Sequence, residues 1–228
     1  MRIVHYHYVF DDEREAFGRQ LDYLASAFEP VSLSEAVERL RSGSVRGREL
    51  VVTFDDGFRN QFANAAPLLA ERGWCACFFL VTELVGARAA EAERLCRERF
   101  HLPRPVEPMS WAQAEELLMR GHEVGSHTRT HPELTALAAP ALDEELETSR
   151  AEIERRPGAA PAHFSAPYGD EARFSAAVAD AARRAGYASC ANAQRGVNTA
   201  PEDVFALRRH HLEASWPIAH VRYFLGGT

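Results

Sequence analysis

Residues 121–134, with the sequence GHEVGSHTRTHPEL, form the stretch around which we expect the rest of the chain to be organised. The segment HEVGSH alternates apolar and polar residues, which predicts a short strand, and residues 126–132 are typical of the turn that leaves it. His127 and His131 are four residues apart, so a helical turn would place both imidazoles on one face, within reach of one ion. An isolated HxxxH pattern is more often a polar loop than a metal site, so the pair needs support from a second element.

A second stretch, VVTFDDG at positions 51–57, brings two carboxylates to the end of an apolar strand. Adjacent side chains on a strand point to opposite faces, so Asp55 and Asp56 share a pocket only if the strand ends there, and Gly57 permits that turn. Two neighbouring carboxylates resist joint ionisation unless a cation lies beside them. The DG pair alone is common in surface turns. Together with the two histidines, the acids instead predict an Asp-His-His metal site with a spare Asp beside it.

The order TFDDG followed by GHEVGSHTRTH resembles the NodB-type polysaccharide deacetylases, which form carbohydrate esterase family four. The resemblance implies that Asp55 is the catalytic base and that Asp56, His127 and His131 hold one divalent metal ion. Zinc is the default expectation, and iron, cobalt or nickel suit the same ligands.

A third block, SAPYG at positions 165–169, resembles the (R)xPYG element of the same family. The resemblance implies that the backbone N–H of Tyr168 stabilises the oxyanion, and we assign both Pro167 and Tyr168 to substrate binding. In many relatives an arginine that orients the base stands where this chain has Ser165, and a serine cannot do that.

The stretch LRRHHL at positions 207–212 is the nearest match to the Leu-x-His element of the family. On a strand, Arg209 and His211 share one face and His210 points to the other. We expect His211 to be the general acid that protonates the leaving amine, with a structural role at the barrel rim as the alternative. Arg209 is expected to contact the substrate and, with His211, to supply the charge of the missing arginine. His163 begins its strand and should lie far from the site.

The first strand carries two more histidines, His5 and His7, on one face. His7 is nearer the C-terminal end of that strand, and relatives often open with a similar strand that ends in Tyr-His. We expect a structural histidine and not a ligand, because three metal ligands are already assigned.

The periodicity predicts an α/β fold, and the resemblance implies a distorted (β/α)7–8 barrel of the NodB homology type, with the site at the C-terminal ends of the strands. Residues 85–108 contain no clear strand and form either a lid or wall of the substrate cleft or an inert surface excursion. Strands are expected at residues 3–10, 74–81, 163–168, 187–193 and 206–212 and just before Asp55 and His127, and helices at residues 13–28, 34–40, 60–72, 110–120, 142–156, 171–185 and 217–225.

Composition and length are ordinary for a soluble globular protein, with 228 residues of which 46% are hydrophobic and 26% charged. We expect one polysaccharide-deacetylase-like catalytic domain over residues 1–228. A net charge of −7 excludes a typical nucleic-acid-binding protein. None of the four cysteines forms a CxxC pair, so we expect reduced thiols. The polar N-terminus and the lack of a long apolar stretch predict a cytoplasmic protein without a membrane span, although removal of a leader would leave the same pattern.

These features predict a metal-dependent hydrolase that removes an N-acetyl group from an amino sugar, either a soluble or carrier-linked intermediate or an oligosaccharide. One alternative is hydrolysis of another C–N bond at the same site, such as deformylation or opening of a cyclic amide. Another is a catalytically silent carbohydrate-binding protein, which Asp55 disfavours because a binding protein needs no base.

Overall fold

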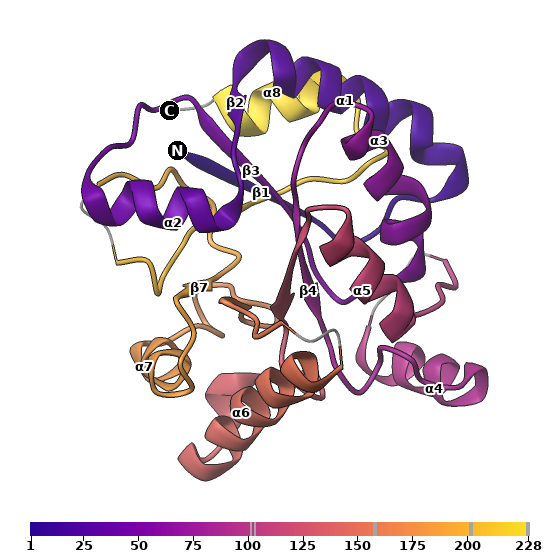
Figure 1. The fold of residues 1–228 in the computed structure, drawn as a ribbon, viewed down its shortest axis with the longest axis vertical. Coiled ribbons are helices and arrows are strands. Elements are labelled where there is room, and N and C mark those ends of the chain that lie inside the picture. The colour runs from indigo at the N-terminus through magenta and orange to yellow at the C-terminus, as the bar shows by residue number, and fades with distance from the viewer. Residues whose placement is uncertain (101, 103, 157–158, 201–202, 227–228) are drawn as a thin grey trace.

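The structure, a computed structural model, describes residues 1–100, 102, 104–156, 159–200 and 203–226 (Figure 1). Strands and helices alternate along most of the chain. The strands are β1 (Arg2–Tyr6), β2 (Glu29–Pro30), β3 (Glu49–Phe54), β4 (Cys77–Leu80), β5 (Glu123–Ser126), β6 (His163–Ser165), β7 (Ser189–Ala191) and β8 (His210–His211). The helices are α1 (Arg14–Ala27), α2 (Leu33–Ser42), α3 (Ala66–Ala70), α4 (Ala89–Arg99), α5 (Trp111–Met119), α6 (Ala139–Arg155), α7 (Ala176–Arg184) and α8 (Ile218–Gly226), with short helical turns η1 (Asp11–Glu13), η2 (Gln61–Ala65) and η3 (Leu134–Ala136).

The strands form one parallel sheet in the order β7-β6-β5-β4-β3-β1-β8, and β2 pairs with β3 outside this path. The segment that leads into β8 also closes the sheet, because Leu207 forms a parallel bridge with Ala191 of β7. Its N–H donates to the carbonyl of Cys190 at 3.0 Å, and its carbonyl accepts from the N–H of Asn192 at 2.8 Å. The sheet therefore curls into a distorted barrel, as the sequence predicted.

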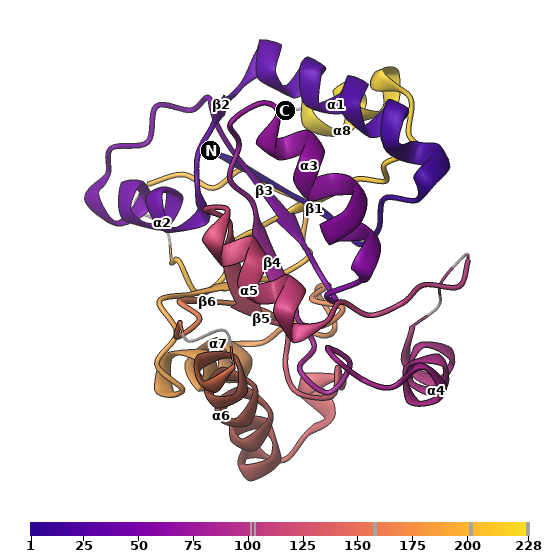
Figure 2. The same ribbon diagram turned by 45° about the vertical axis from the view of Figure 1, so that its right-hand side comes forward.

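The central strands are mostly apolar and are buried along their whole length, as in β3 (ELVVTF) and β4 (CFFL). This burial on both faces is expected for parallel strands with side chains inside the barrel and helices outside it. Helices α1 and α8 lie side by side over one part of the sheet, while α6 and α7 lie together at the opposite end of the view (Figures 1 and 2). The carboxyl ends of all the paired strands lie at one rim of the barrel because the sheet is parallel.

Several element boundaries differ from the predicted ones for local reasons. Strand β2 was missed because two residues are too short to carry a periodic pattern. Helix α2 begins one residue before the predicted start, at Leu33, because Ser32 caps it: its side chain accepts from the N–H of Glu35 at 3.1 Å. The helix predicted at residues 60–72 begins with the π-helical turn η2. The last three predicted strands are shorter than expected, and α7 begins only at Ala176.

All four cysteines are free. Every helix within the described ranges is too short or too polar to cross a membrane.

Candidate active site

The two adjacent carboxylates lie where β3 leaves the sheet. The N–H of Asp55 donates to the carbonyl of Tyr6 at 3.0 Å, which is the last backbone bond between β1 and β3. The chain then turns sharply, because Asp56 and Gly57 both have a left-handed backbone, with φ of 76° and 79°. A Cβ atom at Gly57 would also lie 3.0 Å from the side chain of Leu80. The turn allows both carboxylates to reach one cavity, as the sequence predicted.

Asp56, His127 and His131 meet at the carboxyl rim. The Oδ1 atom of Asp56 lies 3.5 Å from the Nε2 atom of each histidine. All three side chains are buried, and Asp56 Oδ1 has no hydrogen-bond partner within the described ranges. Buried polar atoms rarely stay unpaired, so an unpaired carboxylate oxygen beside two imidazole nitrogens fits a divalent transition metal. The three residues offer one ligand atom each and leave open positions for water and substrate.

The two histidines converge through a left-handed turn and not through the helical turn that their spacing suggested. Thr128 and His131 have φ of 71° and 60°. The hydroxyl of Thr128 accepts from the N–H of His131 at 2.9 Å, and the carboxylate of Glu145 accepts from two other N–H groups of the turn at 3.0 and 2.9 Å. The Nδ1 atom of His127 lies 2.8 Å from the carbonyl of Ser165. This contact requires the proton on Nδ1 and leaves Nε2 free to bind a metal.

Arg209 holds the second carboxylate. Its Nη1 and Nη2 atoms donate to the two oxygens of Asp55 at 2.8 and 2.7 Å. The remaining N–H groups donate to the hydroxyls of Thr53 and Ser165 and to the carbonyl of Asn192. Because all five N–H groups are used, the geometry favours a role in orienting Asp55 over the predicted contact with substrate. Arg209, which donates to Ser165 Oγ at 2.8 Å, thus stands in for the arginine that many relatives have at the position of Ser165.

The two neighbouring carboxyl groups have opposite electrostatic environments. Burial raises the pKa of both, and for Asp56 the charge of Asp55 raises the pKa further. For Asp55, the charge and the hydrogen bonds of Arg209 outweigh burial, so its pKa lies well below the usual range. Asp55 is therefore ionised at neutral pH without a bound metal ion, whereas the ionised form of Asp56 needs a cation nearby.

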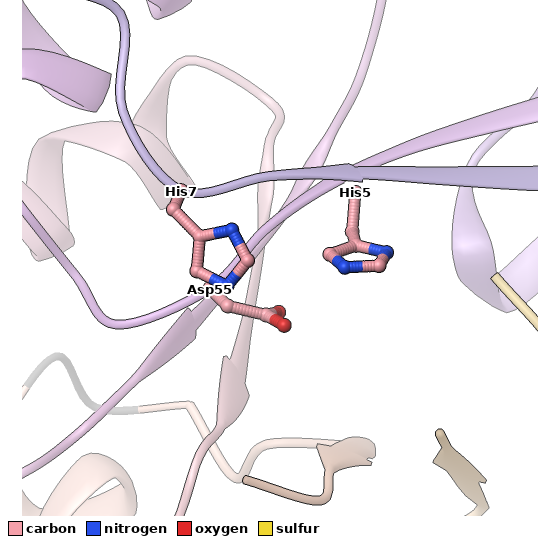
Figure 3. Close-up of side chains that lie close together, drawn as sticks. All are labelled: His5, His7 and Asp55. Atoms are coloured by element: carbon pink, nitrogen blue, oxygen red, sulfur yellow. The ribbon is translucent and has the colours of Figure 1, made fainter. Parts of the chain in front are cut away.

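Three further histidines line the same cavity. Figure 3 shows His5 and His7 projecting from the β1 segment towards the carboxylate of Asp55, and their ligand atoms all lie within 4.8 Å of one another. The ring of His211 stacks on that of His5 at 5.1 Å between centroids and meets that of His7 edge-on at 5.2 Å. Burial lowers the pKa of all three, to about 4 for His7. All three rings are therefore neutral at physiological pH.

The metal-ligand candidates and Asp55 line a cavity of about 440 Å³. Tyr168 is 41% exposed, has φ of 60° and places its ring edge-on to that of His131 at 4.9 Å. Pro167 is buried and does not line the cavity, although its neighbours Ala166 and Tyr168 do. This position favours a role of Pro167 in shaping the loop, and its predicted contact with the substrate stays a prediction.

Another part of the cavity wall comes from residues 85–108, for which two roles were left open. Arg99, Phe100 and Leu102 line the cavity, and the ring of Phe100 contacts that of His131 at 4.6 Å between centroids. This part of residues 85–108 is thus a wall of the cleft; residues 101 and 103 lie outside the described ranges.

The remaining histidine candidates lie away from the cavity. His163 is at the opposite end of the barrel, where it contacts the hydroxyls of Ser34 and Ser189 at 2.9 and 2.8 Å. His210 faces outward, because its neighbours on β8 alternate between the two faces. Sequence reasoning missed His5 and His7 as site residues, although the position of His7 directly after a strand was the signal that could have identified it.

The fold and the site define a β/α barrel with an Asp-His-His cluster at its carboxyl rim. A sequence model of the polysaccharide deacetylase family matches residues 42–190, and the chain belongs to that family. It is 31% identical over 153 residues to the chitooligosaccharide deacetylase of Sinorhizobium fredii, covering 66% of this chain and 55% of that protein. It is 33% identical over 135 residues to the chitooligosaccharide deacetylase of a Bradyrhizobium species, covering 58% and 51%. The chain thus spans about half the length of these relatives.

Solved structures share the whole architecture at low sequence identity. IcaB from Ammonifex degensii has a TM-score of 0.80 and 22% identity and covers 98% of this chain and 95% of its own. The Streptococcus pyogenes deacetylase PplD, solved in complex with acetate, has a TM-score of 0.80 and 18% identity and covers 98% and 97%. These similarities show the fold.

Proposed function

We propose that residues 1–228 form one catalytic domain that removes N-acetyl groups from amino sugars with one bound divalent metal ion, zinc by default. The observation that carries the proposal is the arrangement of two adjacent carboxylates in one cavity. Asp56 faces His127 and His131 as a cation site, while Asp55 is ionised and fixed by Arg209. Membership of the polysaccharide deacetylase family supports the same chemistry.

Each residue of the site has a distinct part in the proposed reaction. When bound by Asp56, His127 and His131, the ion supplies Lewis acidity that polarises the acetamide carbonyl and lowers the pKa of water. Asp55 accepts the proton of the attacking water through its carboxylate. The N–H of Tyr168, which donates no hydrogen bond to the described part of the chain, is available to the oxyanion.

The leaving amine must also receive a proton, and the strand register favours His7 over the predicted His211 as its donor. Tyr6 pairs with Phe54, so the next residues, His7 and Asp55, lie level at the rim. His5 pairs with both Thr53 and His211, which places His211 two residues deeper in the barrel. Because the pKa of Asp55 is low, the protonated carboxyl readily gives up the proton that it has taken from water. The neutral ring of His7 can accept this proton and donate it to the leaving amine.

The substrate class follows from the relatives and the cavity together. The names of two relatives specify chitooligosaccharides, and a cavity of about 440 Å³ falls in the usual range for binding one sugar-sized group. We propose an N-acetylated hexosamine unit, presented as an oligosaccharide or as a soluble or carrier-linked intermediate.

The test is acetate release from N-acetylglucosamine, its oligomers and nucleotide-linked N-acetyl sugars by the zinc-loaded protein. We expect acetate release from at least one of these three substrate classes, and loss of that release in Asp55→Asn. His210 faces away from the cavity, so His210→Asn serves as the control and should still release acetate. Stoichiometric zinc with no acetate from any substrate would contradict the proposal and favour a silent sugar-binding protein.

A further inference from the structure

A buried amide joins the two residues to which the proposed function assigns proton transfer. Gln61 opens the π-helical turn η2 and is fully buried. Its Nε2 atom donates to the carbonyl of His7 at 2.7 Å and to the carbonyl of Asp55 at 2.5 Å. One side chain therefore holds the backbone of the proposed acid and that of the proposed base at the same time.

The position of this contact explains why an amide is needed there. Strands β1 and β3 are paired up to Tyr6 and Phe54, and their last backbone bond runs from the N–H of Asp55 to the carbonyl of Tyr6. Beyond it the two chains diverge, and the carbonyls of His7 and Asp55 have no backbone donor within the described ranges. The two N–H groups of Gln61 continue the pairing of the strands by one more step, at the level where the reaction takes place.

The local helix geometry delivers the side chain to this point. The turn Gln61–Ala65 is π-helical, a rare geometry that occurs mostly as single turns and is frequent at functional sites. It also carries Asn64, whose amide donates to the carbonyl of Val9 at 2.9 Å and to the carboxylate of Asp11 at 2.8 Å. Asn64 thus makes the same kind of contact to the same loop, but beyond the site.

We propose that Gln61 is a positioning residue that sets the separation of His7 and Asp55. The proposal rests on the proposed function, since it concerns the geometry of that reaction. Gln61 itself does not line the cavity, and it contacts the lining residues His7 and Asp55 only through their backbone carbonyls. Its loss should slow the chemical step and leave metal binding and substrate binding largely unchanged.

The experiment compares Gln61→Met, which keeps the size of the side chain and removes both donors, with Asn64→Leu as the matched control. We expect Gln61→Met to lower kcat by about 10–100-fold, the scale for a misplacement of about 1 Å. Its KM should stay within about threefold and its metal content should remain one ion per chain, in keeping with an effect confined to the chemical step. Asn64→Leu should lower Tm to a similar extent and keep kcat within about twofold, because it loosens the loop without touching the site.

A second variant keeps the test decisive if Gln61→Met fails to fold. Gln61→Glu has the same shape and, when protonated, only one donor, so its kcat should fall between those of the wild type and Gln61→Met. Equal losses of kcat in the Gln61 and Asn64 variants would show a purely structural role and overturn the proposal. So would loss of the metal in either Gln61 variant. Acetate release by the wild-type protein and its loss in Asp55→Asn test the proposed function separately, in the same assay.

Discussion

Two clusters of one aspartate and two histidines lie side by side at the rim of this barrel. In each, three potential metal-ligand atoms lie within 4.8 Å of one another. They differ in what the aspartate contacts. Both oxygens of Asp55 accept from Arg209 at 2.8 and 2.7 Å, whereas Asp56 Oδ1 has no partner within the described ranges.

That difference assigns the two clusters to different chemistry. A cation bound to Asp55 would lie against a guanidinium, and the two like charges would repel at short range. The cluster of Asp55 with His5 and His7 is therefore suited to proton transfer, and the cluster of Asp56 with His127 and His131 to a metal. The residue types of the two clusters are the same, so the sequence alone does not tell which cluster binds the metal. The charge that distinguishes them is that of Arg209, which is distant in sequence from Asp55.

The largest expected effect comes from removing a ligand from the metal cluster. His131→Ala should lose the ion and all measurable acetate release, because two ligands hold a transition metal poorly. His5→Ala, its counterpart in the other cluster, should keep one ion per chain. Elemental analysis of the two purified variants gives the answer. Two ions in the wild type, one of which disappears in His5→Ala, would mean that both clusters bind metal.

Replacing the base should separate the two aspartates. Asp55→Asn keeps the shape of the side chain and cannot accept a proton as a carboxylate does. We expect full metal content and a rate about 100-fold or more below the wild type, the usual scale for a general base. Metal content and initial rates should be measured on the same preparation. A near-normal rate would remove Asp55 from the mechanism.

The proton donor can be identified by comparing a substrate whose leaving group needs a proton with one whose leaving group does not. His7→Ala should slow hydrolysis of an N-acetyl sugar by about 100-fold. It should slow 4-nitrophenyl acetate much less, because a nitrophenolate leaves without protonation. His211→Asn, one layer deeper, should slow both substrates to a similar and smaller extent. If the amide-selective loss appears in His211→Asn, His211 is the acid and the register argument is wrong.

Replacing Arg209 should have the smallest effect on the rate and the clearest effect on its pH dependence. In Arg209→Met, burial acts on Asp55 without the opposing charge, so its pKa rises and the acidic limb of kcat/KM moves to higher pH. The rate at neutral pH should fall by about 10–100-fold, the usual scale for a group that orients a catalytic residue. The exposed neighbour Arg208 provides the control, since Arg208→Met should leave the profile unchanged.

The ion pair of Asp55 and Arg209 also affects the stability of the fold. A depressed pKa of Asp55 stabilises the fold above the ordinary pKa of an aspartate, and this stabilisation is lost as the pH falls through the folded-state pKa. The difference in Tm between wild type and Arg209→Met should therefore be largest near neutral pH and shrink in acid. A difference that grows in acid would contradict the assigned state of Asp55.

The sequence was most informative where reactive side chains directly follow a strand. The barrel was predicted correctly, and Asp55, Asp56, His127 and His131 lie together as expected, because parallel strands bring their carboxyl ends to one rim. The role of Arg209 was harder to predict, since Asp55 lies 154 residues away in sequence. Gln61 gave no signal, because a single amide inside a predicted helix has no distinguishing pattern.

The backbone of the site was also beyond prediction. Four non-glycine residues of the described chain have positive φ, and all lie at the site: Asp56, Thr128, His131 and Tyr168. Sequence rules assign such conformations to glycine or asparagine, and the surrounding fold must impose them elsewhere at a cost of about 1–3 kcal/mol each. The prediction of a helical turn for His127 and His131 was wrong because Thr128 and His131 have a left-handed backbone.

The closure of the barrel by its last strand bears on how the chain is made. Strand β1 pairs with β3 on one side and with β8 on the other, so one edge of the first strand stays unpaired until the much later residues of β8 have been synthesised. Asp55 meets its counter-charge only when the segment around Arg209 docks, and burying an unpaired carboxylate before then would be costly. A ribosome-bound chain that stops short of Arg209 should therefore keep this rim open and hydrated. Docking of the segment around Arg209 and assembly of the base would then be coupled steps.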